Sequence, residues 1–198
     1  GRENPSQYEQ SFFGAHKALV YEHIPYGVVL DENVSLDTLK AFSVVLLADA
    51  AILSPKEAAL FEAYVKQGGN LLITGNSGMY GQRGELLPSS VLEPLIGARA
   101  LAVVRDKDNF FVLHRDPEGM PRCDVDIPLD WPVLAYGPAV VYASPQDSPL
   151  THGALLRPVR TLRQQAGLEG TEFPGSAGEP AGPAVLLHSV GQGKVLTL

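Results

Sequence analysis

Between residues 54 and 77 the hydrophobic and polar positions follow a helical period, stop at two glycines and then form a short apolar run. Ser54 and Glu57 form a capping box before a helix, and the proline between them suits the first helical position. The apolar positions of that helix recur at helical spacing, at Ala58, Phe61 and Val65. Gly68 and its neighbouring glycine end the helix, so the run 71–74 predicts a strand that is buried on both faces.

The same alternation occurs upstream. Two apolar runs, 24–30 and 44–48, predict strands, and residues 35–40 between them have room for a short helix. Residues 90–96 predict a later helix that opens with a second capping box, Ser90 to Glu93. The first helix of the chain is indicated by apolar positions on one face, at Tyr8, Phe12, Ala15 and Leu19. Helices that alternate with apolar strands are typical of a parallel sheet with right-handed crossovers.

Beyond residue 98 the pattern changes to strand-like runs separated by proline and glycine turns. These runs cover residues 109–114, 138–143, 184–189 and 194–198, and the last two are joined by a hairpin turn at 190–193. The segment 167–183 is rich in glycine and proline and predicts a mobile loop. We therefore expect an α/β core over 1–104 and an antiparallel β-rich annex over 105–198 that returns to the core.

The first residues of the chain bear on the sheet order. A doubly wound domain normally opens with a strand, yet residues 1–7 contain nothing that could form one. The chain also begins without methionine and stops inside the apolar run 194–198, which suggests a fragment. We expect the first, central strand to be missing, and the unpaired backbone groups to recruit another segment or a neighbouring molecule.

Composition excludes several classes of protein. The 198 residues carry a net charge of −7 and no basic run, which argues against binding to nucleic acid. The single cysteine, Cys123, excludes an internal disulfide and a multi-cysteine metal site. No apolar segment is long enough to cross a membrane. The compartment stays open, with the cytoplasm favoured.

The order of four sequence pieces points to a family. They are HKALVYEHIPYGVVL, LSPKEAALFEAYVKQGGNLLITG, LEPLIG and VGQGKVLTL, within residues 8–98 and 184–198. Together they resemble the β-galactosidase trimerisation domain, a class I glutamine-amidotransferase-like module that follows the catalytic barrel in glycoside hydrolase family 42. The resemblance implies a flavodoxin-like three-layer α/β sandwich with a mainly parallel sheet. It also implies two partners, the parent catalytic barrel and further copies of the chain.

The residues that would carry catalysis are missing from the expected turn. Active class I amidotransferases place a cysteine in Gly-x-Cys-x-Gly after a strand and a His-x-Glu later in the chain, whereas this chain has Gly75-Asn76-Ser77-Gly78 and no His-x-Glu. The turn is also one residue short of the Gly-x-Ser-x-Gly elbow of serine hydrolases. We therefore expect no catalytic residue, and Cys123 is the only candidate thiol.

Candidate binding residues follow two of the predicted strands. Asp49 comes after the run 44–48, and Asn76 and Ser77 come after the run 71–74. The carboxyl ends of parallel strands form the crevice where open α/β sheets bind ligands, so these residues could contact a sugar or a neighbouring subunit. The alternative is a polar turn and a solvated acid without a ligand.

A metal or cofactor is not expected. The five histidines lack the spacing of a zinc pair. Asp124 and Asp126 alternate with apolar residues, as the solvent-facing side of a strand would. Two hypotheses on function remain open. One is a non-catalytic accessory and oligomerisation domain of a glycoside hydrolase. The other is a free-standing small-molecule hydrolase or sugar-binding module that uses the crevice.

Overall fold

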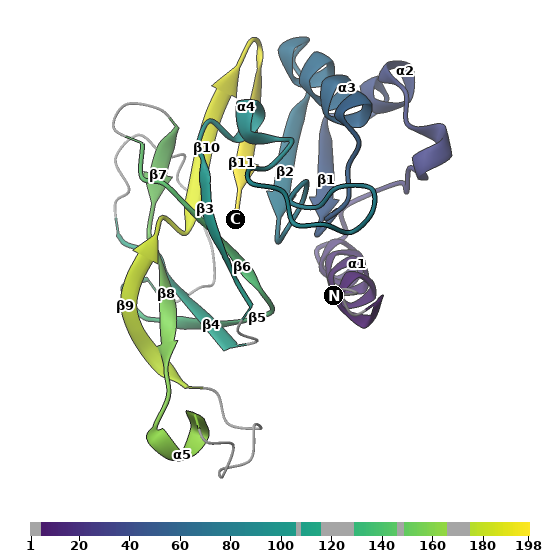
Figure 1. Ribbon diagram of the computed structural model, residues 1–198. Helices are drawn as coiled ribbons and strands as arrows, with labels where there is room; N and C mark the ends of the chain where they lie inside the picture. Colours follow the sequence, from purple (N-terminus) through teal and green to yellow (C-terminus); the bar gives the residue numbers. More distant parts are fainter. Residues whose placement is uncertain (1–4, 106–107, 116–128, 146–148, 166–174) are drawn as a thin grey trace.

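The computed structural model describes residues 5–105, 108–115, 129–145, 149–165 and 175–198 (Figure 1). Its main sheet has five strands in the order β1-β2-β11-β10-β7. Three neighbours are parallel, namely β1 (Val44–Ala48), β2 (Asn70–Thr74) and β11 (Gly193–Thr197). The antiparallel strands β10 (Val185–Val190) and β7 (Leu150–His152) complete the sheet. The sheet is therefore mixed rather than mainly parallel, because a hairpin reverses the chain before β11.

The strand expected at 71–74 lies in the core. Leu71 and Ile73 of β2 and Val195 of β11 are fully buried. β2 has a parallel partner on each side, as expected for an internal strand, but the expected burial on both faces is only partial, because Leu72 on the other face is half-buried. The predicted hairpin is also confirmed: Val190 pairs with Gly193, and Gly191 between them has a φ of 61°.

The helix before β2 begins where the capping box places it. In α3 (Pro55–Lys66) the Glu57 N–H donates to the Ser54 hydroxyl at 3.2 Å, and the Ser54 N–H donates to the Glu57 carboxylate at 2.7 Å. Tyr64 of α3 is buried, and its hydroxyl donates to the Phe42 carbonyl at 2.9 Å. The Tyr64 bond attaches α3 to the segment that enters β1.

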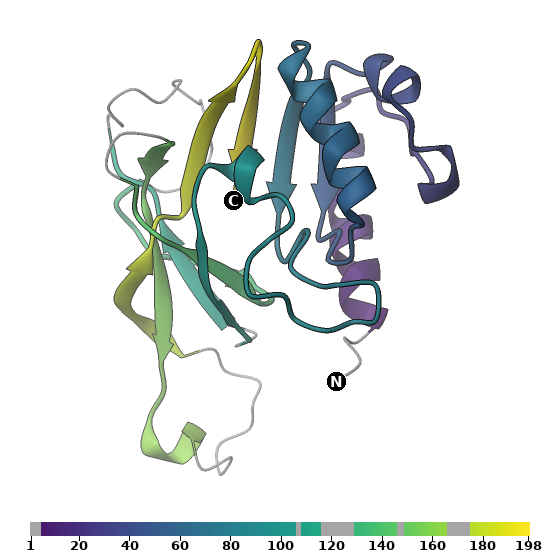
Figure 2. The same ribbon diagram turned by 45° about the horizontal axis from the view of Figure 1, so that its top comes forward.

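The expected strand at 24–30 is wrong. Residues 24–30 form neither helix nor strand, and most of their side chains are exposed. They connect α1 (Pro5–Tyr21) to the short helices η1 (Asp31–Asn33) and α2 (Leu36–Lys40). A strand needs a partner, and among the described residues β1 pairs only with β2 and so forms the sheet edge. In Figure 2, α3 lies in front of β1 and α1 lies behind it.

The second half of the chain adds two antiparallel sheets. One pairs β3 (Ala100–Val104) with β6 (Ala139–Tyr142). The other has the order β5-β4-β8-β9, and its strands are β5 (Val133–Tyr136), β4 (Asp108–Val112), β8 (Ala154–Val159) and β9 (Ser176–Gly182). The expected boundary at residue 104 falls between β3 and β4 and stays a prediction, because β7, β10 and β11 also join the main sheet.

Two expectations in this half need correction or lie outside the described residues. The loop expected at 167–183 contains β9, which pairs with β8 through backbone groups and therefore needs few apolar side chains. The rest of that loop, residues 167–174, lies outside the described residues, as do Cys123, Asp124 and Asp126. The short helix α5 (Leu162–Gln165) follows β8. No helix in the described ranges is long and apolar enough to span a membrane.

Candidate functional site

The three predicted site residues lie together at the carboxyl ends of β1 and β2. The Asp49 carboxylate accepts a hydrogen bond from the Asn76 N–H at 2.7 Å. The Ser77 hydroxyl lies 2.7 Å from the Thr74 carbonyl oxygen and 3.1 Å from that of Leu47, and it accepts the Ala50 N–H at 3.0 Å. Each of these bonds joins side chain to backbone, so the three residues hold the two strand ends together.

The backbone around Asp49 is specialised for this contact. Asp49 has a φ of 55°, a left-handed conformation that aspartate tolerates better than most residues. Gly75 has a φ of 61°, and a Cβ added there would lie 2.6 Å from the Asp49 carboxylate oxygen. Only glycine fits at position 75, because its missing side chain makes room for the Asp49 carboxylate.

The chain itself closes the crevice between these strand ends. Gly78 and Tyr80 donate backbone hydrogen bonds to Ala50 and Ala51 at 2.9 and 3.0 Å, and Val91 donates to Gly78 at 3.0 Å. Met79, Tyr80 and Leu92 are buried in this cover. Asp49 is 5% exposed, and Asn76 and Ser77 are 0% exposed. A role in ligand binding stays a prediction for these residues, and it would require segment 78–92 to move.

The Asn76 amide is buried without a partner. Neither its oxygen nor its nitrogen has a hydrogen bond among the described residues. Each unpaired buried group costs about 1–3 kcal/mol. The Asn76 backbone N–H therefore stabilises this turn while its side chain does not.

Ser77 lacks the partners of a catalytic nucleophile. Its hydroxyl contacts backbone groups only, and the hydrogen bonds of the histidines within the described ranges go elsewhere. His188, for example, bonds the Leu95 carbonyl at 2.9 Å. A serine nucleophile requires a base within hydrogen-bond reach. The described residues therefore form no serine–histidine pair at this turn.

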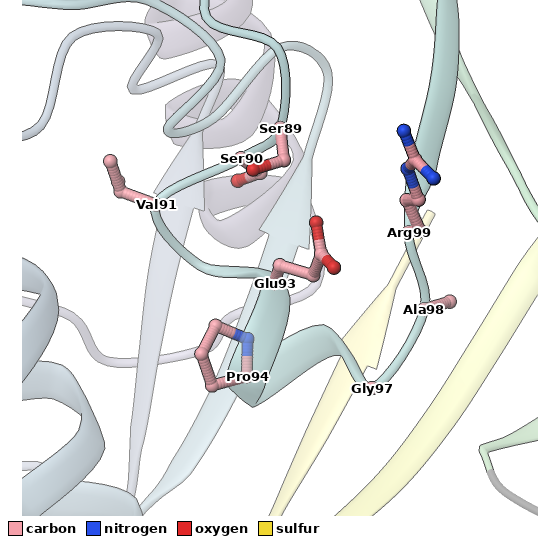
Figure 3. Close-up of a pocket in the computed structure, with 8 residues that line it drawn as sticks. All are labelled: Ser89, Ser90, Val91, Glu93, Pro94, Gly97, Ala98 and Arg99. Carbon is pink, nitrogen blue, oxygen red and sulfur yellow. The ribbon is translucent and has the colours of Figure 1, made fainter.

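An open hollow lies beside the cover and was not expected from the sequence. It measures about 600 Å³ and is lined by Ser89, Ser90, Val91, Glu93, Pro94, Gly97, Ala98 and Arg99. Figure 3 shows the Glu93 carboxylate and the Arg99 side chain on opposite sides of this space. One Glu93 carboxylate oxygen is buried without a hydrogen bond among the described residues. These groups offer hydrogen-bond donors and acceptors to a polar ligand.

The sequence predicts that Glu93 takes part in a capping box with Ser90, and it therefore does not indicate that Glu93 lines this hollow. The helix α4 (Glu93–Ile96) begins at Glu93 itself, and the Ser90 hydroxyl accepts the Leu92 N–H at 3.1 Å. Glu93 therefore does not reach back to cap the helix as Glu57 does in α3. The spacing of serine and glutamate is the same in both segments, but α4 is only four residues long.

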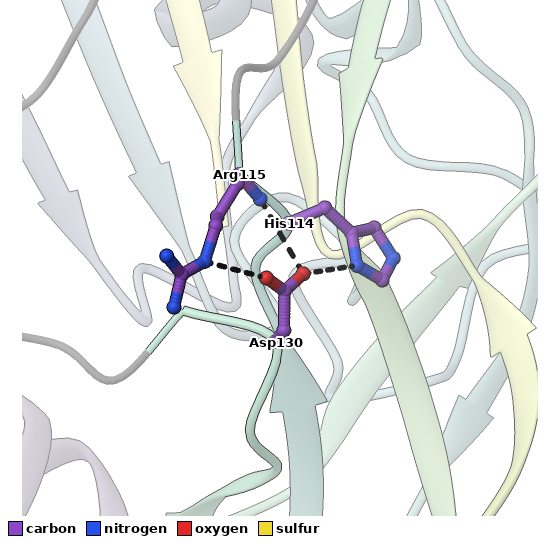
Figure 4. Close-up of polar contacts among 3 residues, drawn as sticks. All are labelled: His114, Arg115 and Asp130. Atoms are coloured by element: carbon purple, nitrogen blue, oxygen red, sulfur yellow. Dashed lines mark hydrogen bonds and ion pairs between the residues drawn. The ribbon is translucent and has the colours of Figure 1, made fainter.

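A second polar cluster lies at the end of β4. Asp130 contacts His114 at 3.3 Å and the Arg115 guanidinium at 3.0 Å (Figure 4). Desolvation raises the pKa of Asp130, but hydrogen bonds from His114 and Arg115 outweigh it and lower that pKa below its ordinary value. The His152 ring lies 6.4 Å from the His114 ring. No group of potential metal ligands occurs among the described residues.

The His152 ring predicts a pH dependence of stability. Burial, and then the positive charge of His114, lower the pKa of His152 from its ordinary 6.5. The folded state thus disfavours protonated His152. The stability that neutral His152 contributes is fully present above pH 6.5 and is lost as the pH falls through the lower pKa of the folded state. We expect the urea concentration at the midpoint of unfolding to decrease when the pH is lowered from about 7 to about 5. This decrease in the urea midpoint should be smaller in His152→Gln. If the midpoint of that variant depends on pH as steeply as that of the parent protein, His152 does not cause the pH dependence.

The fold of this chain is similar to that of several proteins of known structure. No protein-family model and no curated protein matches the chain. Among solved structures, the chain is similar to Gan42B, a GH42 β-galactosidase from G. stearothermophilus, with a TM-score of 0.67 and 15% identity over 98% of this chain and 24% of that one. The cold-adapted β-galactosidase from Rahnella sp. R3 gives a TM-score of 0.64 and 18% identity over 96% of this chain and 24% of that one.

A third similarity is to a shorter protein. A ThuA-like protein from Bacteroides uniformis matches with a TM-score of 0.63 and 14% identity, over 100% of this chain and 77% of that one. The chain spans about a quarter of the length of the β-galactosidases. At these identities the matches show a shared α/β fold, which occurs both within long glycosidases and in a chain of similar size.

Proposed function

We propose that this chain is a non-catalytic accessory domain of a larger glycoside hydrolase, of the β-galactosidase trimerisation type, and that it serves oligomerisation. One observation carries the proposal: nearly the whole chain superposes on a quarter of two GH42 β-galactosidases. Three of the four sequence pieces that resemble the trimerisation domain lie within residues 16–97, and the fourth contains β11 of the main sheet. In this proposal the catalytic barrel is the partner of the domain within the parent chain.

The proposed lack of catalysis is supported at the turn after β2. Ser77 is bonded to backbone groups, and Asp49 is used to hold the Asn76 N–H. Segment 78–92 covers both residues. A hydrolase would need a nucleophile or paired acids open to its substrate, and the described residues at these strand ends supply none.

The proposed role in association is supported by apolar side chains near the start of the chain. Among the described residues, exposed large apolar side chains are frequent between positions 8 and 44, where they include Tyr8, Phe13, Tyr21, Ile24 and Val28. Exposed apolar side chains that form a contiguous patch mark surfaces that contact other protein, and we propose that these residues form one. The parent barrel or a further subunit would cover them.

Galactoside hydrolysis tests this function. We expect the full parent enzyme to hydrolyse a chromogenic β-galactoside and the 198-residue chain alone to show no activity above buffer. Asp49→Asn in the parent should leave kcat/KM within about twofold, since Asp49 holds the turn rather than the substrate. Hydrolysis by the isolated chain, lost in Ser77→Ala, would overturn the proposal.

The second candidate is a free-standing small-molecule hydrolase or sugar-binding module. It is favoured by the ThuA-like protein, because the chain covers 77% of that protein's length. The polar hollow beside Glu93 and Arg99 is open to a ligand, unlike the crevice at Asp49. The native reading frame separates the two candidates, since an upstream catalytic barrel supports the accessory domain and its absence supports the free-standing module.

A further inference from the structure

The open hollow beside segment 78–92 holds one acidic and one basic side chain. Of the described residues that line its volume of about 600 Å³, only Glu93 and Arg99 carry charge. Sites that bind small molecules usually measure about 300–1,000 Å³ and contain a few polar groups that fix the orientation of the ligand. The hollow therefore has the size of a small-molecule site, and it offers one charge of each sign.

Neither of these charged groups has a partner within the described part of the chain. The Glu93 carboxylate and the Arg99 guanidinium form no ion pair there, with each other or with another side chain. One oxygen of the Glu93 carboxylate is also buried without a hydrogen bond among these residues. A charged group that has lost part of its hydration is stabilised by a ligand group of opposite charge, because charge-assisted hydrogen bonds are the strong ones.

Backbone hydrogen bonds hold the two walls of the hollow in place. The helix α4 ends at Gly97, which has a φ of 74° and whose N–H donates to the Glu93 carbonyl at 2.8 Å. On the other wall the Ala143 N–H donates to the Arg99 carbonyl at 2.9 Å. In Figure 3 the Glu93 carboxylate extends from α4 toward the segment that carries Arg99. A ligand that binds between the two side chains therefore meets a backbone that is already fixed, which favours binding.

The two opposite charges distinguish between classes of ligand. A simple cation would leave the Arg99 guanidinium unpaired, and a simple anion would leave the Glu93 carboxylate unpaired. A neutral sugar has hydroxyl groups for both, but none of the lining residues is aromatic, so the hollow offers no flat ring on which a sugar could stack. A molecule with an ammonium group and a carboxylate pairs with both side chains through charge-assisted hydrogen bonds.

We propose that this hollow binds a small zwitterion of the amino-acid class. The ammonium group of the ligand donates to the Glu93 carboxylate, and its carboxylate accepts from the Arg99 guanidinium. The site binds the ligand without making or breaking a covalent bond. The proposal rests on the hollow alone, so it stands or falls independently of the accessory role in a glycosidase.

An NMR titration with L-leucine tests the proposal. We expect the backbone amide signals of Glu93, Gly97 and Arg99 to shift and to reach saturation as leucine is added. Isoamylamine and isocaproate have the carbon skeleton of leucine but lack its carboxylate and its ammonium group, respectively. Each should bind at least about tenfold more weakly than leucine, because each leaves one protein charge unpaired. Galactose should cause no shift.

Variants assign the binding to the two charged side chains. Glu93→Gln and Arg99→Gln remove one charge each, and each should weaken leucine binding at least about tenfold. Arg157→Gln is the matched control, because Arg157 is an exposed residue of β8 that does not line the hollow. It should bind leucine as the parent protein does. Unchanged amide signals of the buried residues Leu71 and Val195 show that each variant is folded.

Four results would overturn the proposal. They are the absence of a saturable shift with leucine, equal affinity for leucine and for one of its singly charged analogues, leucine binding that survives both Glu93→Gln and Arg99→Gln, and shifts caused by galactose but not by leucine. The last result would assign the hollow to a sugar and support the sugar-binding module. None of the four bears on the accessory domain, which galactoside hydrolysis tests separately.

Discussion

Gly193→Ala is expected to destabilise the domain by about 3 kcal/mol or more, which is a large fraction of the total stability of a domain. Gly193 opens β11, which lies between β2 and β10 in the main sheet. A Cβ at this position would lie 2.5 Å from the Val65 carbonyl oxygen, and closer still to that of Gly69. Both atoms belong to the backbone, so a side-chain rotation cannot relieve the overlap. Urea denaturation followed by circular dichroism measures the loss.

Gly14→Ala is the matched control for this change. Gly14 lies inside α1, and no atom lies within 4 Å of a Cβ added there. Alanine is favoured over glycine in a helix by about 1 kcal/mol, so this variant should be as stable as the parent or slightly more stable. If Gly193→Ala unfolds at the same urea concentration as Gly14→Ala, the close approach of β11 to the end of α3 is wrong.

Asp49→Ala is expected to lower the free energy of unfolding by about 3 kcal/mol. The substitution leaves the buried Asn76 N–H without its acceptor, which costs about 1–3 kcal/mol. It also places alanine at a φ of 55°, which costs a further 1–2 kcal/mol or so. The two strand ends should loosen together, and the same urea measurement records the change.

Asp49→Asn tests whether the negative charge of Asp49 contributes to stability in addition to its hydrogen bond and its backbone conformation. Asparagine tolerates the left-handed conformation, and its side-chain oxygen can accept the same N–H at Asn76. We expect it to lose no more than about 1 kcal/mol. A loss in Asp49→Asn as large as that in Asp49→Ala would show that the carboxylate charge itself matters, and this would revive a binding role for Asp49.

The local elements could be predicted where neighbouring residues alone determine them. The capping box of Ser54 and Glu57, the glycines after α3 and the turn at Gly191 act through bonds within a few residues, and the structure follows each of them. The run 24–30 has the composition of a strand but pairs with no strand in the described part of the chain, and strand formation depends on a second segment. The sequence therefore indicates its preference without deciding its structure.

The candidate site was predictable in part for the same reason. Asp49 and Asn76 come together because both follow parallel strands that end at one edge, which sequence order alone suggests. Their burial depends on segment 78–92, which folds back over the strand ends. No local sequence pattern predicts that this segment covers Asp49 and Asn76. The hollow at Glu93 and Arg99 was hidden because the same serine–glutamate spacing caps α3 but not α4.

We propose that this chain associates protein subunits and does not catalyse a reaction. Light scattering of the parent enzyme, with and without residues 1–198, measures its contribution to assembly. We expect the full enzyme to be a homo-oligomer and the deleted enzyme, with its catalytic barrel still folded by circular dichroism, to have the mass of a single chain. An oligomer that is unchanged by the deletion would show that this chain does not hold the subunits together.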